Sequence, residues 1–177
     1  MKKIIACSLL FSAAALSTAQ AADGTITFEG SVNAVTCTID SASKDMSVLL
    51  PSINSSAFSA ANTVATSPAV KFKISATGCD AAAVSAAAVF STGDNVDPEN
   101  GNLNNTYPDG TDVQVRLFKA DGTTAINLAN YGESADNKGT VTDGKVDIEF
   151  YANYFSKAST ATPGLLKTSI QYSVQYL

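Results

Sequence analysis

The sequence predicts an all-β domain built as a sandwich of short antiparallel strands. After the first twenty or so positions, apolar residues recur with a period of two far more often than with the helical period of 3.6. Clusters of Gly, Asp, Asn and Ser separate these alternating runs at short intervals. Strands with one apolar face that are joined by tight turns are typical of a β-sandwich.

Three internal segments show the alternation most clearly, namely residues 70–75, 113–117 and 145–150. In each of them one face carries Val, Ile, Leu or Phe and the other carries charged or polar side chains, which predicts a strand with one buried face. The alanine-rich stretch 81–88 is compatible with a helix but is short and runs into Val and Phe, so we expect a loop that enters a strand. The polar stretch 94–112 is expected to be an exposed connection.

The first 21 residues predict a cleaved secretory signal peptide. Lys2 and Lys3 form a basic start, residues 4–15 form an apolar run, and residues 19–21 (Ala-Gln-Ala) fit a cleavage site. An apolar run of about a dozen residues is too short to cross roughly 30 Å of hydrocarbon, so a membrane anchor is not expected. The sequence therefore predicts a protein exported from the cytoplasm.

Charge and cysteine content limit the possible partners. Cleavage leaves 9 of the 11 basic side chains against 16 acidic ones, a formal charge of −7, which argues against nucleic acid as a partner. Cys7 leaves with the signal peptide, and Cys37 and Cys79 remain in a chain sent to an oxidising space, so we expect them to form a disulfide. A structural zinc site needs four soft ligands, and the chain has no His and no further Cys.

The sequence offers little support for a catalytic or metal-binding site. Without His there is no Ser-His-Asp arrangement, and oxidised cysteines are not nucleophiles. Hydrolysis by paired carboxylates stays open, although Asp147 and Glu149 fit solvent-facing strand positions. Asp94, Asp97 and Glu99 miss the calcium-loop spacing, so a solvated loop is favoured. We expect neither an enzyme nor a cofactor or metal.

Both ends of the mature chain are amphipathic strands. From residue 24 to residue 33 one face is apolar or glycine and the other is polar; the first face consists of Gly24, Ile26, Phe28, Gly30 and Val32. Residues 166–176 alternate in the same way up to the end of the chain; their less polar face consists of Leu166, Thr168, Ile170, Tyr172, Val174 and Tyr176.

These two ends resemble those of a known family. Residues 24–32 (GTITFEGSV) followed by residues 33–40 (NAVTCTID) look like the start of a mature type 1 fimbrial subunit, of the major-subunit kind, assembled by the chaperone–usher route. Subunits of that family end in an alternating strand with Tyr next to last and Gly about fourteen positions from the terminus, and this chain has Tyr176 and Gly164 there. The resemblance covers the whole mature chain.

The resemblance implies an immunoglobulin-like sandwich that lacks its final strand and leaves a groove beside the C-terminal strand. It divides the chain into a signal peptide (1–21), an N-terminal donor-strand extension (22–33) and a pilin domain (34–177). A periplasmic chaperone would fill the groove during export, and the extension of another subunit would fill it in the fibre, as β-strand addition.

The resemblance also implies a role for individual residues. Ile26, Phe28 and Val32 would enter the groove of a neighbouring subunit, with Gly30 either permitting close approach there or simply tolerated in a strand. The chaperone and the acceptor groove would use the C-terminal strand, namely Gly164, Ile170, Tyr172, Val174, Tyr176 and the Leu177 carboxylate.

The function implied is that of a structural subunit of a cell-surface fimbria that supports adhesion. Its partners would be other subunits, a periplasmic chaperone and an outer-membrane usher. The length leaves no room for a separate receptor-binding domain and favours the major shaft subunit, but adaptor and minor subunits share it. The other alternative is an exported immunoglobulin-like binding module in which residues 24–33 complete their own domain.

Overall fold

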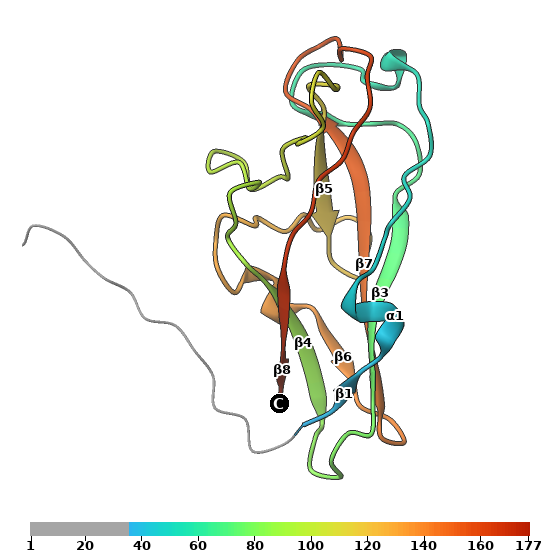
Figure 1. The fold of residues 1–177 in the computed structure, drawn as a ribbon, viewed down its shortest axis with the longest axis vertical. Coiled ribbons are helices and arrows are strands. Elements are labelled where there is room, and N and C mark those ends of the chain that lie inside the picture. Colours follow the sequence, from blue (N-terminus) through green and yellow to red (C-terminus); the bar gives the residue numbers. More distant parts are fainter. Residues whose placement is uncertain (1–35) are drawn as a thin grey trace, which may run out of the picture. The chain divides into compact units, whose positions relative to one another are not determined.

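The computed structural model describes residues 36–177, and the predicted signal peptide (1–21) and donor extension (22–33) lie outside the described residues. Two antiparallel sheets make up the domain (Figure 1). The first contains β1 (Thr38–Ile39), β2 (Thr63–Val64), β3 (Val70–Thr77), β5 (Gln114–Phe118) and β7 (Lys145–Ser156). The second contains β4 (Ser85–Phe90), β6 (Lys138–Thr140) and β8 (Tyr172–Tyr176). The predicted all-β sandwich is confirmed.

β7 is the central strand of the first sheet. It pairs with all eight residues of β3, with β5, and near its C-terminal end with β2, while β1 pairs with the far end of β3. In the second sheet β4 lies between β6 and β8. The helical elements are short: α1 (Ser41–Lys44), η1 (Ser55–Ala57) and η2 (Glu133–Asp136). No helix among residues 36–177 is long and apolar enough to cross a membrane.

The core lies between the two sheets and is centred on Phe150 of β7. Its ring stacks on Phe72 of β3 at 5.5 Å and meets Phe90 of β4 edge to face at 5.0 Å. Ala86, Ala87 and Ala88 are fully buried in β4. The alanine-rich stretch thus forms a turn followed by a strand, as expected, because alanines fit a strand that is covered closely on both faces.

The polar stretch 94–112 differs from its expectation as an exposed connection. Asp97 and Asn102 are buried beneath it, where Gln114 of β5 donates from Nε2 to Asp97 Oδ2 (2.6 Å) and accepts from Asn102 Nδ2 (3.1 Å). The prediction of an exposed connection is wrong for Asp97 and Asn102, because these polar side chains and Gln114 satisfy one another's hydrogen bonds, which removes the cost of burying them.

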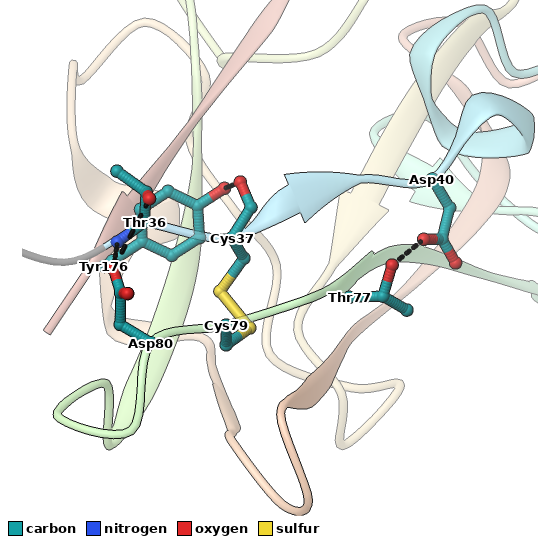
Figure 2. Close-up of a disulfide and its surroundings, with 7 residues drawn as sticks. All are labelled: Thr36, Cys37, Asp40, Thr77, Cys79, Asp80 and Tyr176. Carbon is teal, nitrogen blue, oxygen red and sulfur yellow. Dashed lines mark hydrogen bonds between the residues drawn. A yellow bond between two sulfur atoms is a disulfide. The ribbon is translucent and has the colours of Figure 1, made fainter.

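The expected disulfide is present and ties β1 to the end of β3 (Figure 2). Cys37 precedes β1, and Cys79 follows β3 by two residues. The link is flanked by two further connections between the same segments, from Thr36 N to Asp80 Oδ2 (2.7 Å) and from Thr77 Oγ1 to Asp40 Oδ1 (3.0 Å). The start of the described chain is therefore fixed against the turn that follows β3.

Candidate acceptor groove

β8 lies at the open edge of its sheet. Ser85 and Leu177 exchange both of their backbone hydrogen bonds (2.9 and 2.8 Å), so the odd-numbered residues of this strand bond to β4. In an antiparallel pair the intervening residues point their N–H and C=O groups the other way. The backbone groups of Tyr172, Val174 and Tyr176 therefore face away from β4, and within residues 36–177 no strand pairs with that edge.

The stretch 165–171 continues this edge upward from β8, as the red trace in Figure 1 shows. The carbonyl oxygens of Leu165 and Lys167 accept from Thr111 N (3.1 Å) and Thr106 N (2.7 Å), again through odd-numbered residues. Even-numbered side chains in this stretch are half-buried and odd-numbered ones are exposed. An unpaired edge with an inward apolar face thus extends over residues 166–176.

The opposite wall is the extended stretch 46–50, which follows α1. Met46, Val48 and Leu50 turn half-buried side chains inward, and both Met46 and Leu50 pack against the core, whereas Leu49 is 90 % exposed. Between the two walls lies a groove of about 900 Å³. Its floor is formed by side chains of the core, namely Phe72, Ile74, Phe90, Leu103, Val115, Leu117 and Ala152.

The groove combines the two properties that an added strand requires. It offers a row of unpaired backbone groups, and it opens onto apolar side chains of the core. Thr168 Oγ1 is buried in its wall and has no hydrogen-bond partner among the described residues. An extended chain with apolar side chains at alternate positions matches this surface.

Two tyrosine hydroxyl groups span the end of the groove that is nearest the C-terminus. Tyr172 donates to the carbonyl oxygen of Ser43 (2.6 Å), and Tyr176 donates to that of Cys37 (3.2 Å), the contact shown in Figure 2. Burial raises the pKa of both phenols above its ordinary value of 10.0, since the charged form is poorly solvated there. The C-terminal strand is thereby tethered to the start of the domain.

The predicted C-terminal site residues do not all lie in the groove. Ile170 and Tyr172 line it, and Val174 and Tyr176 continue the same face against the core. Leu177 closes the strand, its carbonyl oxygen accepting from Val84 N and Ser85 N (both 2.9 Å).

Gly164 lies outside the groove, where its backbone packs against the turn containing Gly110. A side chain at Gly164 would place its Cβ 2.6 Å from Thr111 N. The four predicted donor residues, Ile26, Phe28, Gly30 and Val32, lie outside the described residues.

Sequence reasoning missed the second wall and the floor of the groove. The alternation of Met46, Val48 and Leu50 was a usable signal for the wall, because it predicts an extended segment with one apolar face. The floor comes from both sheets, so no local pattern could identify it.

Two of the three carboxylates considered for a calcium loop, Asp97 and Glu99, are paired with a lysine instead. Lys157 Nζ lies 2.9 Å from Asp97 Oδ2 and 3.1 Å from Glu99 Oε2. The hydrogen bond from Lys157 lowers the pKa of Asp97, with further hydrogen bonds from Glu99 N and Gln114. No cluster of three or more metal-ligating side chains occurs in the part of the chain that the structure describes.

Comparison with known proteins gives consistent matches. A family model described as "Fimbrial protein" matches residues 26–177. The "Major fimbrial subunit SMF-1" of Stenotrophomonas maltophilia (strain K279a) is 38 % identical over 93 % of this chain and 98 % of its own. The "F17 fimbrial protein" of Escherichia coli is 34 % identical over 99 % of both chains.

The fold has a counterpart among solved structures. The P pilus rod subunit PapA superimposes with a TM-score of 0.54 over 86 % of this chain and 100 % of its own, at 18 % identity. At that identity the likeness concerns the fold alone, and it agrees with the immunoglobulin-like sandwich described above.

Proposed function

The chain belongs to the fimbrial protein family, as a structural subunit of a cell-surface fimbria, and from this premise we propose that it polymerises by donor-strand exchange. In this proposal residues 22–33 of one copy leave their own domain and fill the groove of another. The domain boundaries proposed from the sequence, with residues 34–177 as the pilin domain, are those that this mechanism requires.

The observation that carries the proposal is the open edge beside the groove. It runs for eleven residues, from residue 166 to residue 176, and the predicted donor strand at residues 24–33 has ten. Every second residue of the added strand would exchange hydrogen bonds with the outward-facing backbone groups of the even-numbered residues on this edge. The alternate side chains Ile26, Phe28 and Val32 would enter the apolar floor, and Gly30 would let the two backbones approach closely.

The free energy at stake is large compared with the stability of a domain. Burying three such side chains contributes about 1.5–3 kcal/mol each, or on the order of 5–9 kcal/mol before the cost of ordering the strand. A typical domain is stable by about 5–15 kcal/mol in total. A subunit with an empty groove is therefore expected to be marginal or unfolded.

That marginal stability is the reason for proposing a chaperone. A periplasmic chaperone that adds one of its own strands would cover the same edge, contacting Tyr172, Val174 and Tyr176, and would hold the Leu177 carboxylate. An outer-membrane usher would then receive the complex. The major shaft position is favoured because the relative of highest identity given above is named a major subunit and matches this chain over nearly its full length.

The test replaces Phe28 with Asp in the donor strand. A charge at this position cannot enter an apolar groove, so the variant should lose polymers while still binding the chaperone, because its own groove is unchanged. The matched control is Thr27→Asp, which places the same charge on the solvent face of the strand and should polymerise normally.

The assay is electrophoresis of assembled fibres together with co-purification of the chaperone. Normal polymers from Phe28→Asp would refute the assignment of the donor strand. Loss of the fold of the variant's own domain would instead support the alternative of a self-completed binding module.

A further inference from the structure

Two exposed apolar patches lie at opposite ends of the stretch 165–177. The base patch consists of Ala81, Ala82, Val84 and Leu177, with Val84 70 % and Leu177 49 % exposed. The tip patch consists of Tyr107 and Leu165, which are 42 % and 62 % exposed. Exposed large apolar side chains that gather in this way indicate an interaction surface.

Each patch is held in place by backbone hydrogen bonds. In the base patch Val84 N donates to Leu177 O (2.9 Å). In the tip patch Gly110 N donates to Tyr107 O (3.1 Å) and Thr111 N donates to Leu165 O (3.1 Å), so one short turn holds the backbone of both residues. Both patches are therefore preformed surfaces.

The extension leaves the domain at the base patch. Thr36 is held by hydrogen bonds to Asp80, among them Thr36 N to Asp80 Oδ2 (2.7 Å) and Asp80 N to Thr36 O (3.0 Å). Asp80 directly precedes the base patch. The predicted donor strand ends at Asn33, only three residues before Thr36. Three extended residues span at most about 10 Å, so the base of the donating domain must lie close to the point where the strand leaves the groove.

The direction in which the donor strand inserts decides at which end of the groove it leaves. All strand pairs in the described domain are antiparallel, and an antiparallel ladder is slightly more stable per residue than a parallel one. A donor antiparallel to residues 166–176 has its C-terminal end, at Asn33, beside Leu165. The base patch of the donating subunit is thus brought onto the tip patch of the acceptor.

We propose that the base patch of each subunit packs on the tip patch of the subunit whose groove it fills, forming a second, head-to-tail interface between copies of this chain. The inference rests on the proposed function. Because the two patches are different surfaces, the contact is heterologous and continues along an open chain, as a fibre requires. Its effect is to fix the angle between successive domains.

Disulfide trapping tests the contact. Val84→Cys and Leu165→Cys are introduced into the same chain, fibres are oxidised, and the products are separated under denaturing, non-reducing conditions. The inference predicts covalent ladders from this pair and none from either single variant. The matched control combines Val84→Cys with Tyr131→Cys, since Tyr131 is also exposed (45 %) but belongs to neither patch, and it should give no ladder.

The outcomes separate this inference from the proposed function. Fibres that form without covalent ladders overturn the inference and leave donor-strand exchange standing, and covalent dimers from Val84→Cys alone overturn it in favour of a base-to-base contact. Absence of fibres from the unmodified chain would instead count against the proposed function.

A pair of charged substitutions tests the same contact if the cysteine variants fail to assemble. Val84→Asp should speed fibre dissociation on the order of tenfold, and adding Leu165→Lys should restore the original rate. No recovery by the second substitution would overturn the contact.

Discussion

Replacing Gly164 with Ala tests why the C-terminal pattern contains a glycine outside the groove. The new Cβ would lie 2.6 Å from Thr111 N and 2.7 Å from Gly110 C, both of them backbone atoms. Because neither can rotate away, the backbone at Leu165 must shift, and overpacking of this kind costs about 1–3 kcal/mol. The same shift disturbs the first residues of the groove edge.

The assay is thermal unfolding of the subunit bound to a synthetic peptide of residues 22–33, followed by far-ultraviolet circular dichroism. In a domain of this size each kcal/mol lowers the midpoint by about 2–4 °C. The matched control is Gly93→Ala, where no atom lies within 4 Å of the new Cβ. It should leave the midpoint unchanged or raise it slightly, because alanine restricts the unfolded chain. Equal midpoints for the two variants would refute the close-approach explanation.

Three further predictions concern the stability of the same complex. Replacing Cys37 and Cys79 with Ser should reduce the free energy of unfolding in urea by about 4 kcal/mol, the chain-entropy value for a sequence separation of 42. Lys157→Ala should destabilise the domain by about 1 kcal/mol. The pKa of Asp97 is lowered in the fold, so this loss should be full above pH 4 and should shrink as the pH falls through that lowered pKa. The pKa of Tyr176 is raised, so the unfolded chain loses this proton first, and stability should be constant below pH 10 and fall above it.

Each of these predictions has a contradicting result. Cysteine-free protein with the original urea midpoint would show that the β1 to β3 tie contributes nothing. A destabilisation by Lys157→Ala that grows as the pH falls would contradict an ion pair between Lys157 and Asp97. A loss of stability above pH 10 that is unchanged in Tyr176→Phe would show that other groups cause it.

Alternation in the sequence predicted the strands well where only one face is buried. The segments 70–75 and 145–150 lie within β3 and β7 and have one buried face. The segment 113–117 overlaps β5, but the prediction of one buried face is wrong there, because Gln114 is buried as well. Alternation failed where both faces are covered: β7 continues to Ser156 through residues 151–156 (YANYFS), which do not alternate and are all buried or half-buried. A strand whose two faces are both covered has no solvent face to reveal its period.

From the sequence, the groove could be predicted only as the place of a strand that the domain lacks, and the residues that line its floor could not. The edge at residues 166–176 was visible as a clean alternation, although only Tyr172–Tyr176 forms β8, because the preceding residues bond to loop groups such as Asn95 Nδ2 and Thr106 N. The buried position of Asp97 and the tight contact at Gly164 depend on residues more than 15 positions away. Such long-range partners leave no local signature.

The central claim is that residues 22–33 act between molecules, and peptide capping tests it most directly. The mature chain is allowed to assemble with a large excess of a synthetic peptide of residues 22–33, and the products are counted by native mass spectrometry. The claim predicts that the peptide competes for grooves and ends growth, giving single subunits that each carry one peptide, whereas a peptide with Phe28→Asp leaves the polymers intact. A mature chain that stays a folded monomer and binds no peptide would contradict it.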